Sequence, residues 1–312
     1  MTTERPDRPG ALAAIGGTPL VRLGRLIEPG MAEVWVKLEA ANPTGSYKDR
    51  MALAMIEGAE RSGRLRPGQT VVEYTGGSTG SSLAFVCALK GYPLRIVSAT
   101  CFAAEKIQTM RAFGADVELI DSPQGITPTT IPRMMERARE IVAETGGYLT
   151  DQFRNADMID GYLGLGHEIA DQTDGRVEAL VIYVGTAGCF IGATRGLRER
   201  VPSVRRVAVE PAESAVLSGR PPGTHRIEGG GVGFMPPQLS MDEVDQVIAV
   251  PTDEAVSMAR RAARADGIWG GPSTGANLVA ALAVARGLGP DGRVVTVQVD
   301  SGLKYLRSEV YA

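Results

Sequence analysis

Short apolar runs alternate along most of the chain with longer segments in which apolar residues recur at helical spacing. The short runs are rich in β-branched residues, which is typical of strands buried inside a parallel sheet. Such an alternation predicts an α/β fold in which helices connect parallel strands. The expected strands are 71–74, 94–98, 117–120, 179–184, 204–209, 247–250 and 294–299.

Helices are expected between these strands, and Gly91 and Gly114 stand where two of them would end. The Pro-punctuated stretch 122–132 separates the first group of strands from the second. We therefore expect two doubly wound α/β units with a ligand-binding cleft at the carboxyl ends of their strands. The expected helices are 81–90, 103–113, 133–144, 191–200, 253–265 and 277–286.

Composition argues against a nucleic-acid-binding, membrane or secreted protein. The chain has 312 residues, enough for one large or two modest domains, and its 33 basic and 36 acidic residues nearly cancel. Interspersed charge of both signs indicates neither nucleic acid nor an anionic membrane as partner, so a small molecule is expected. A polar, proline-rich start and the lack of an eighteen-residue apolar run argue against secretion and membrane spanning.

Cysteine and histidine usage argues against a disulfide-bonded protein and against a metal site. Three widely spaced cysteines without a C-x-x-C pair do not form a disulfide framework, which fits a reducing cytoplasm. The two histidines lie outside any zinc-binding motif, so no metal is expected. Cys101 and Cys189 are interpreted as small buried apolar residues, and no role is assigned to His167 or His225.

The first candidate loop runs from Asn42 to Arg50 and leads into a helix. Thr44 or Ser46 can cap this helix, which places Lys48 in its first turn, where the positive end of the helix dipole disfavours an ammonium. A lysine with a lowered pKa is a ready amine nucleophile for a Schiff base. The alternative is a solvated lysine at a helix end.

The second loop, 75–80, joins a strand to a helix. Backbone amides and hydroxyls at a helix N-terminus favour an anion, so a carboxylate or phosphate is expected there. A plain strand-to-helix turn is the competing interpretation, because glycine and serine suit such turns. The residues concerned are Thr75, Gly76, Gly77, Ser78 and Thr79.

The third loop follows the strongly apolar strand 179–184 and opens the next helix. Its amides suit a phosphate. About twenty residues on, Glu210 occupies the place of an acid that binds the ribose of a dinucleotide, but the glycines are not spaced G-x-G-x-x-G, which favours a lone phosphate. The residues of this predicted phosphate loop are Gly185, Thr186, Ala187, Gly188 and Cys189.

The fourth loop, 270–276, contains Ser273, whose hydroxyl taken alone suits a helix cap. The four loops together offer a nucleophilic lysine, a phosphate cradle, an anion loop and a neutral hydroxyl. This combination describes a site for pyridoxal phosphate and an amino acid.

At these residues the sequence resembles the cysteine synthase and cystathionine β-synthase family of pyridoxal-phosphate enzymes, which includes O-acetylserine sulfhydrylase. The resemblance extends from Gly16-Gly17-Thr18-Pro19-Leu20 to the segment 300–306 and so covers nearly the whole chain. The segment 42–50 is similar to the family pattern N-P-x-G-S-x-K-D-R, and 185–189 is similar to G-T-G-G-T.

The resemblance implies a role for each matching position. Lys48 would form the Schiff base with pyridoxal 5'-phosphate and act as the catalytic base, and the loop 185–189 would hold the phosphate. Ser273 would contact the pyridine nitrogen, while the loop 75–79 and Gln152 would bind the substrate carboxylate.

The second loop departs from the family pattern T-S-G-N-T-G. Gly76 replaces the serine, and Ser78 replaces the asparagine that contacts the cofactor and the substrate. Serine can keep one hydrogen bond but has a shorter reach and lacks the paired donor and acceptor of an amide. In the third loop, Ala187 and Cys189 replace the third and fifth members of the pattern.

The resemblance also implies pyridoxal-phosphate fold type II, the tryptophan synthase β-like arrangement of two doubly wound domains with mostly parallel sheets. Residues 41–150 would form the smaller domain with the Schiff-base lysine and the substrate loop. Residues 13–40 together with 151–312 would form the larger domain with the phosphate loop and the pyridine-nitrogen serine. A homodimer is implied in the same way, while the expected cytoplasmic location rests on the cysteine usage described above.

The implied function is β-replacement on an O-activated serine, with O-acetylserine or O-phosphoserine plus sulfide giving L-cysteine. The neutral Ser273 suits β-elimination and replacement better than transamination. A serine or threonine dehydratase-type elimination is the first alternative. A nicotinamide-dependent oxidoreductase using 185–192 and Glu210, or a non-catalytic homologue, are alternatives of other classes.

Overall fold

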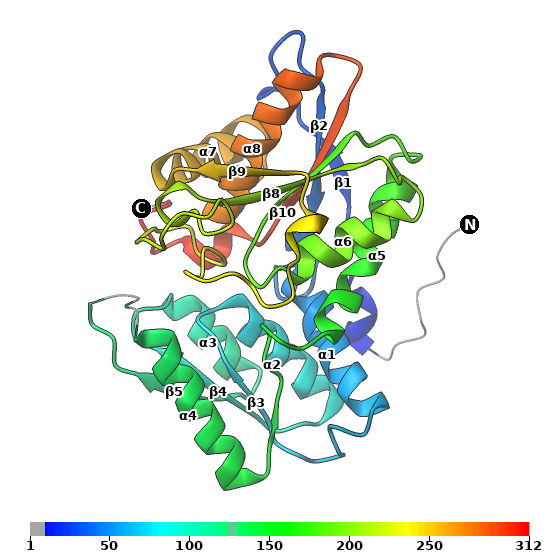
Figure 1. The fold of residues 1–312 in the computed structure, drawn as a ribbon. Coiled ribbons are helices and arrows are strands. Elements are labelled where there is room, and N and C mark those ends of the chain that lie inside the picture. Colours follow the sequence, from blue (N-terminus) through cyan, green and yellow to red (C-terminus); the bar gives the residue numbers. More distant parts are fainter. Residues whose placement is uncertain (1–9, 125–126, 128, 312) are drawn as a thin grey trace.

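The computed structural model describes residues 10–124, 127 and 129–311, so the polar residues 1–9 and the last residue lie outside it. Two sheets organise the chain, one in each lobe of Figure 1. The strands of the six-stranded sheet, in sheet order, are β1 (Leu20–Arg22), β2 (Glu33–Leu38), β10 (Arg293–Gln298), β7 (Ala179–Tyr183), β8 (Arg205–Pro211) and β9 (Gln246–Val250). The four-stranded sheet has the order β5 (Asp116–Ile120), β4 (Leu94–Ala99), β3 (Val71–Tyr74) and β6 (Tyr148–Leu149).

All strand pairs are parallel except β1 with β2, so the predicted α/β architecture with mostly parallel sheets is confirmed. Every expected strand is present. The sequence did not predict β1, β2, β6 or the helix α5. The helices are α1 (Lys48–Arg61), α2 (Ser78–Lys90), α3 (Ala104–Ala112), α4 (Thr130–Thr145), α5 (Asp157–Gln172), α6 (Gly188–Arg198), α7 (Thr252–Asp266) and α8 (Pro272–Leu288).

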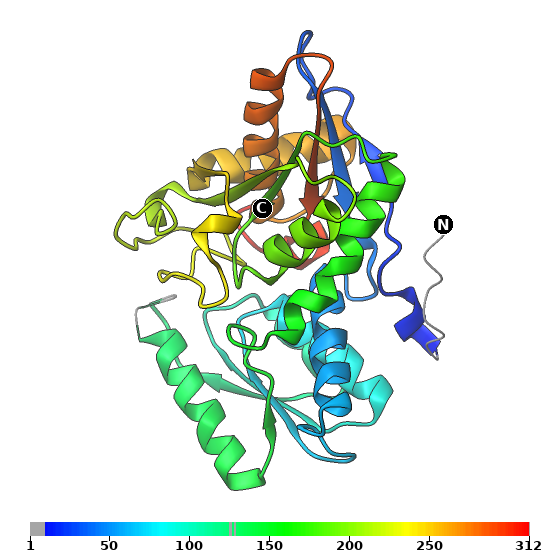
Figure 2. The ribbon, with the colours of Figure 1, turned by 45° about the vertical axis from the view of Figure 1, so that its right-hand side comes forward.

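Helices cover both faces of each sheet. Inward-facing residues of β7, β8 and β10 divide between two clusters, one shared with α5 and α6 and the other with α7 and α8. In the small sheet, α2 and α3 pack on one face and α4 on the other (Figures 1 and 2). The first of these clusters also includes α1 and α2, so one apolar core joins the two lobes.

Local sequence explains where several helices end. Gly91 and Gly114 have φ of 75° and 88°, a left-handed conformation that glycine adopts readily, and both end helices as predicted. Within the described residues, no helix combines the length and apolar composition needed to cross a lipid bilayer.

Candidate active site

Lys48 is the first residue of α1 and is only 7 % exposed. Its Nζ lies 3.5 Å from Met51 Sδ and 5.2 Å from the centre of the Tyr47 ring. Burial lowers the pKa of Lys48 to about 8, whereas the nearby Cys189 and Glu73 act in the opposite direction. The sequence predicted a lowered pKa from the helix dipole. The pKa of Lys48 is indeed lowered, but loss of hydration on burial is the main cause.

The turn before α1 fixes the direction of Lys48. Ser46 Oγ accepts a hydrogen bond from the Lys48 amide at 3.2 Å, while Tyr47 is the N-cap residue. Thr44, the other predicted cap, instead donates through Oγ1 to Asp49 Oδ1 at 2.6 Å. Residues on both sides of Lys48 are therefore held by hydrogen bonds, and its own side chain is buried against Met51 and Tyr47.

The second loop, 75–80, lies against Gln152 although the two are more than seventy residues apart in the sequence. Thr79 Oγ1 donates to Gln152 Oε1 at 2.8 Å, and Gln152 Nε2 donates to the Tyr74 carbonyl at 3.3 Å. Within the loop, the Gly77 amide donates to Thr75 Oγ1 at 3.2 Å. Because α2 begins at Ser78, the amides of Ser78 and Thr79 lie at the helix N-terminus, where an anion is favoured.

Asp300 links the second and fourth loops. Ser78 Oγ donates to Asp300 Oδ2 at 3.4 Å and accepts from Lys304 Nζ at 3.3 Å, while the Gly271 amide donates to Asp300 Oδ1 at 3.3 Å. Burial raises the pKa of Asp300. Asp300 was not among the predicted site residues, although its position just after the carboxyl end of β10 is a usable signal.

The predicted phosphate loop 185–189 forms the entrance to α6, which begins at Gly188. None of its five amides donates to another of the described residues. A Cβ at Gly185 would lie 2.2 Å from the Gly229 carbonyl oxygen, so only glycine fits there. Burial raises the pKa of Cys189, which keeps its thiol neutral and agrees with its predicted apolar role.

Ser273 lies in the first turn of α8 and is 1 % exposed. Its Oγ has no hydrogen-bond partner within the described part of the chain. A buried hydroxyl without a partner is unfavourable, so the arrangement suits a bound group that supplies one. Together with the free amides at 185–189 and the buried amine of Lys48, this hydroxyl fits the pyridine nitrogen of pyridoxal phosphate.

Glu210 does not support the dinucleotide alternative. Its carboxylate accepts hydrogen bonds from the Leu217 amide at 2.7 Å and from the Ser218 amide and hydroxyl at 3.1 and 2.6 Å. These bonds occupy the oxygens that would have to reach a ribose.

His167 pairs with Glu199, and His225 pairs with the Gly231 carbonyl.

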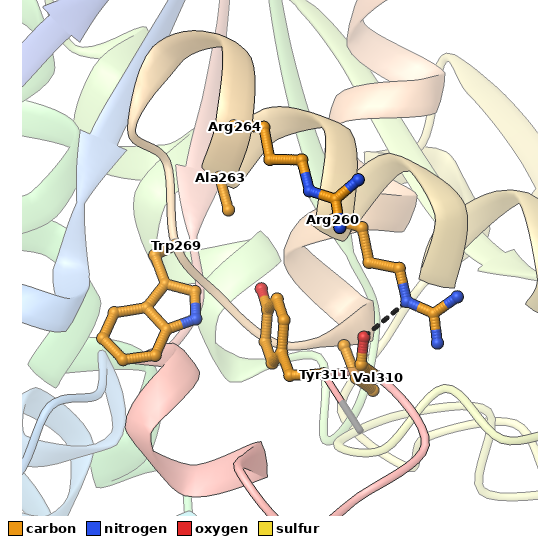
Figure 3. Close-up of a pocket in the computed structure, with 6 residues that line it drawn as sticks. All are labelled: Arg260, Ala263, Arg264, Trp269, Val310 and Tyr311. Atoms are coloured by element: carbon orange, nitrogen blue, oxygen red, sulfur yellow. Dashed lines mark hydrogen bonds between the residues drawn. The ribbon is translucent and has the colours of Figure 1, made fainter.

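A pocket of about 630 Å³ lies elsewhere, at the C-terminal end of the described chain (Figure 3). It holds none of the predicted site residues. Tyr311 links this pocket to the fourth loop, because its Oη donates to the Gly270 carbonyl at 2.6 Å. Its lining consists of Arg260, Ala263, Arg264, Trp269, Val310 and Tyr311.

No group of three or more His, Cys, Asp or Glu in the described ranges is placed to hold a metal ion.

Comparison with known proteins supports the same chemistry. The family model "Pyridoxal-phosphate dependent enzyme" matches residues 11–300. A Staphylococcus aureus cysteine synthase is 40% identical over 300 residues, which is 96% of this chain and 95% of that protein. The crystal structure of an Entamoeba histolytica cysteine synthase has a TM-score of 0.92 at 34% identity and covers 100% of this chain and 93% of that chain.

A second Entamoeba histolytica structure, O-acetyl serine sulfhydrylase isoform 3, has a TM-score of 0.91 at 36% identity and covers 100% of this chain and 93% of that chain. The family model spans both sheets and all four loops. The chain therefore belongs to the pyridoxal-phosphate dependent enzymes and has the fold of the cysteine synthases among them.

Proposed function

We propose that this chain catalyses β-replacement on an O-activated serine, with O-acetylserine and sulfide as substrates and L-cysteine as product. The observation that carries the proposal is the buried Lys48 amine, with its pKa lowered to about 8, at the start of α1. Similarity to cysteine synthases over 96% of the chain supports the choice of reaction. O-phosphoserine remains the alternative activated substrate.

Four groups of this chain would hold pyridoxal phosphate. Lys48 would form the Schiff base, the amides of 185–189 would bind the phosphate, and Ser273 Oγ would face the pyridine nitrogen. Ser78 would replace the family asparagine on the cofactor's oxygen. When bound, the cofactor supplies an electron sink for negative charge at the α-carbon of the substrate.

The protein's own residues would orient the substrate and move its proton. The loop 75–79 and Gln152, already joined through Thr79, would hold the α-carboxylate. Lys48 Nζ would take the α-proton, which requires the neutral amine, and its pKa of about 8 makes that form available near neutral pH. Ser273, a neutral hydroxyl, would not keep the pyridine nitrogen protonated, and this favours elimination and replacement over transamination.

Replacing Lys48 by alanine tests the proposal. We expect cysteine formation from O-acetylserine and sulfide to fall by roughly 10²–10⁴-fold or more, because general base catalysis is lost, while pyridoxal phosphate still binds without a covalent link. Circular dichroism checks that the variant is folded, and borohydride trapping on the wild type checks the link to Lys48. Full turnover in Lys48→Ala would overturn the assignment.

A second assay separates β-replacement from the dehydratase alternative. Elimination alone releases ammonia and a keto acid without sulfide, whereas replacement consumes sulfide and retains the amino group. We expect ammonia release from O-acetylserine to be suppressed when sulfide is added. Equal ammonia release with and without sulfide would favour a dehydratase.

We further propose that the chain functions as a cytoplasmic homodimer with the domain division 41–150 and 13–40 plus 151–312. The three free cysteines suit a reducing compartment. The four-stranded sheet draws its strands from within 71–149, and the six-stranded sheet from 20–38 and 179–298, which supports the proposed boundaries. Light scattering after size-exclusion chromatography tests the dimer.

A further inference from the structure

Ser78 stands where the family pattern has an asparagine that contacts both the cofactor and the substrate. A serine hydroxyl carries one proton, whereas an asparagine amide has two donor hydrogens and an acceptor oxygen. In the structure the Ser78 hydroxyl donates to Asp300 Oδ2 at 3.4 Å, and in the proposed function it would donate to the cofactor's oxygen. Its single proton is spent in either case, so the Ser78 side chain has no donor left for a substrate carboxylate.

Lys304 brings an ammonium to the same point from the C-terminal part of the chain. It lies in the 3-10 helix Gly302–Tyr305, and its Nζ donates to Ser78 Oγ at 3.3 Å. Among the residues that the structure describes, this is its only hydrogen bond, and Lys304 forms no ion pair with any of them. Because an ammonium has three donor hydrogens, two of them remain for a ligand.

Two carboxyl groups influence Lys304 without pairing with it. Burial lowers the pKa of Lys304, whereas the charges of Asp300 and Asp49 raise it. Each carboxyl group has donors of its own, because Asp300 accepts from Tyr305 Oη at 2.7 Å and Asp49 accepts from the Thr44 amide and hydroxyl at 2.8 and 2.6 Å. Burial also raises the pKa of both groups, which favours their neutral forms when another anion binds nearby.

Lys106 is a second lysine beside this loop, but its charge is paired. Its Cδ lies 2.9 Å from where a Cβ on Gly77 would be, and its charge contributes to lowering the pKa of Lys304. Its Nζ pairs with Glu228 and lies 4.5 Å from the centre of the Tyr305 ring. Of these two lysines, Lys304 is therefore the one with positive charge left for a ligand.

Backbone donors lie at the same place. The amides of Gly76, Ser78 and Thr79 donate to none of the residues that the structure describes. Ser78 is the first residue of α2, so its amide and that of Thr79 lie at the positive end of the helix dipole. A carboxylate has two oxygens and can accept hydrogen bonds from backbone amides and from an ammonium at the same time.

We propose that Lys304 is a further substrate-binding residue, which pairs with the α-carboxylate of the amino-acid substrate at the loop 75–79. Lys304 takes over the substrate contact of the family asparagine, while Ser78 keeps the contact with the cofactor. An ion pair with hydrogen bonds is stronger than the neutral amide contact that it replaces. The inference rests on the proposed function for the place of the carboxylate and deepens it, because it assigns a residue that the family pattern does not supply.

The test compares binding of L-serine with binding of L-serinamide, which keeps the amino group and the side chain but lacks the carboxylate charge. Dissociation constants for both are measured without sulfide, through the absorbance of the bound cofactor, in the wild type and in Lys304→Met. We expect the wild type to prefer serine. In the variant the constant for serine should rise by roughly tenfold or more, because hydrogen bonds to a charged group are lost, and the constant for serinamide should rise far less.

Further variants isolate the charge at position 304. Lys304→Gln keeps a donor for Ser78 but not the charge, so it should also lose the preference for serine, and it carries the test should Lys304→Met fold poorly. Lys304→Arg keeps the charge and should retain most of the preference. Lys90→Met is the matched control, since this lysine lies at the other end of α2 and pairs with Glu60 at 2.8 Å. Circular dichroism checks that each variant is folded.

The outcomes separate this inference from the proposed function. A wild type that prefers serine to serinamide but forms no cysteine from an O-activated serine and sulfide would overturn the proposed function alone. A wild type without that preference, or a preference that persists in Lys304→Met and Lys304→Gln, would overturn the role of Lys304 alone. So would a larger loss of preference in Lys106→Met than in Lys304→Met.

Two other roles for Lys304 give different results and would also overturn the inference. If Lys304 only held Ser78 in place, the dissociation constants for serine and serinamide would rise together and their ratio would stay constant. If Lys304 instead contacted the cofactor, titration with pyridoxal phosphate would show weaker cofactor binding in Lys304→Met, again with an unchanged ratio.

Discussion

At the scale of single residues, Ala187 of the predicted phosphate loop has a strained backbone conformation. Its φ is 71°, in the left-handed region, and it is the N-cap residue of α6. For an L-residue with a Cβ this conformation costs roughly 1–2 kcal/mol relative to the right-handed one. The turn at Ala187 nevertheless leads the chain into α6 at Gly188, and the loop amides donate to none of the residues that the structure describes.

Replacing Ala187 by glycine should therefore stabilise the protein. We expect the free energy of unfolding to rise by about 0.5–1 kcal/mol, since relief of the left-handed strain exceeds the added entropy of an unfolded glycine. Urea unfolding monitored by circular dichroism measures the change. Ala193→Gly, in the interior of the same helix, is the control and should instead destabilise by about 1 kcal/mol. A loss of stability in Ala187→Gly would show that the left-handed alanine carries no strain.

The sequence identified the chemistry of single residues better than their surroundings. Lys48 stood out because an ammonium is disfavoured at a helix start. Ser273 alone suits a helix cap and stood out only together with the other three loops and the family resemblance. Both residues prove to be buried. The cause of the lowered pKa of Lys48 was not predictable, because burial depends on the whole fold. Lys304 was not among the predicted site residues, because its contact with Ser78 exists only in three dimensions.

At the scale of elements, the contact between α5 and α6 positions the predicted phosphate loop, 185–189. Three glycines bring the helices together: a Cβ at Gly166, Gly192 or Gly196 would lie 2.2–2.3 Å from a carbonyl oxygen of the opposite helix. At the start of α6, Gly188 packs against Met158 of α5 in the same way, with 2.9 Å from its Cβ position to the sulfur. The loop 185–189 is therefore held in place by backbone contact behind it.

Gly192→Ala should separate these helices. We expect a loss of about 1–3 kcal/mol in the free energy of unfolding, because an added methyl group overpacks the contact. The dissociation constant for pyridoxal phosphate should rise as well, since the loop amides move with α6. Gly164→Ala, on an open face of α5, is the control and should stabilise by about 1 kcal/mol through helix propensity alone. Unfolding curves and cofactor titration of both variants provide the comparison.

Boundaries of elements were the weaker part of the prediction. Four helices begin three to five residues earlier than expected, at Ser78, Thr130, Gly188 and Pro272. Glycine, serine and proline at these starts are typical of loops, and only the packing of each first turn against the sheets reveals it as helix. The short strands β1 and β6 escaped prediction because pairing with β2 and β3 defines them, not their own sequence.

At the scale of the whole molecule, a buried charge network ties α1 to the large sheet. Arg50 pairs with Glu39 and Glu168 at 2.7 Å each, and Lys37 of β2 pairs with Glu168 at 2.7 Å. Burial raises the pKa of Glu168, but its hydrogen bonds and charge contacts with Arg50 and Lys37 outweigh burial and lower the pKa to about 2. Removing one member of such a network leaves an uncompensated buried charge.

This network should make the free energy of unfolding depend on pH in the acid range. Because the folded pKa of Glu168 lies below the unfolded value of 4.5, its contribution is complete above pH 4.5 and disappears as the pH falls towards 2. We expect Glu168→Gln to lose about 3 kcal/mol at pH 7 and progressively less below pH 4.5. Urea unfolding of both proteins at pH 7, 4 and 3 measures this. An equal difference at all three values would exclude Glu168 as the source.

The strand order of the large sheet has a consequence for synthesis on the ribosome. β2 pairs with β10, so residues 33–38 find their parallel neighbour only when residues 293–298 have emerged. The strands of the four-stranded sheet all lie within 71–149 and are complete long before that. We expect the four-stranded sheet of the growing chain to form first, while β1 and β2 pair only with each other. The edge of β2 that β10 covers then stays exposed to misassembly until residues 293–298 have been synthesised.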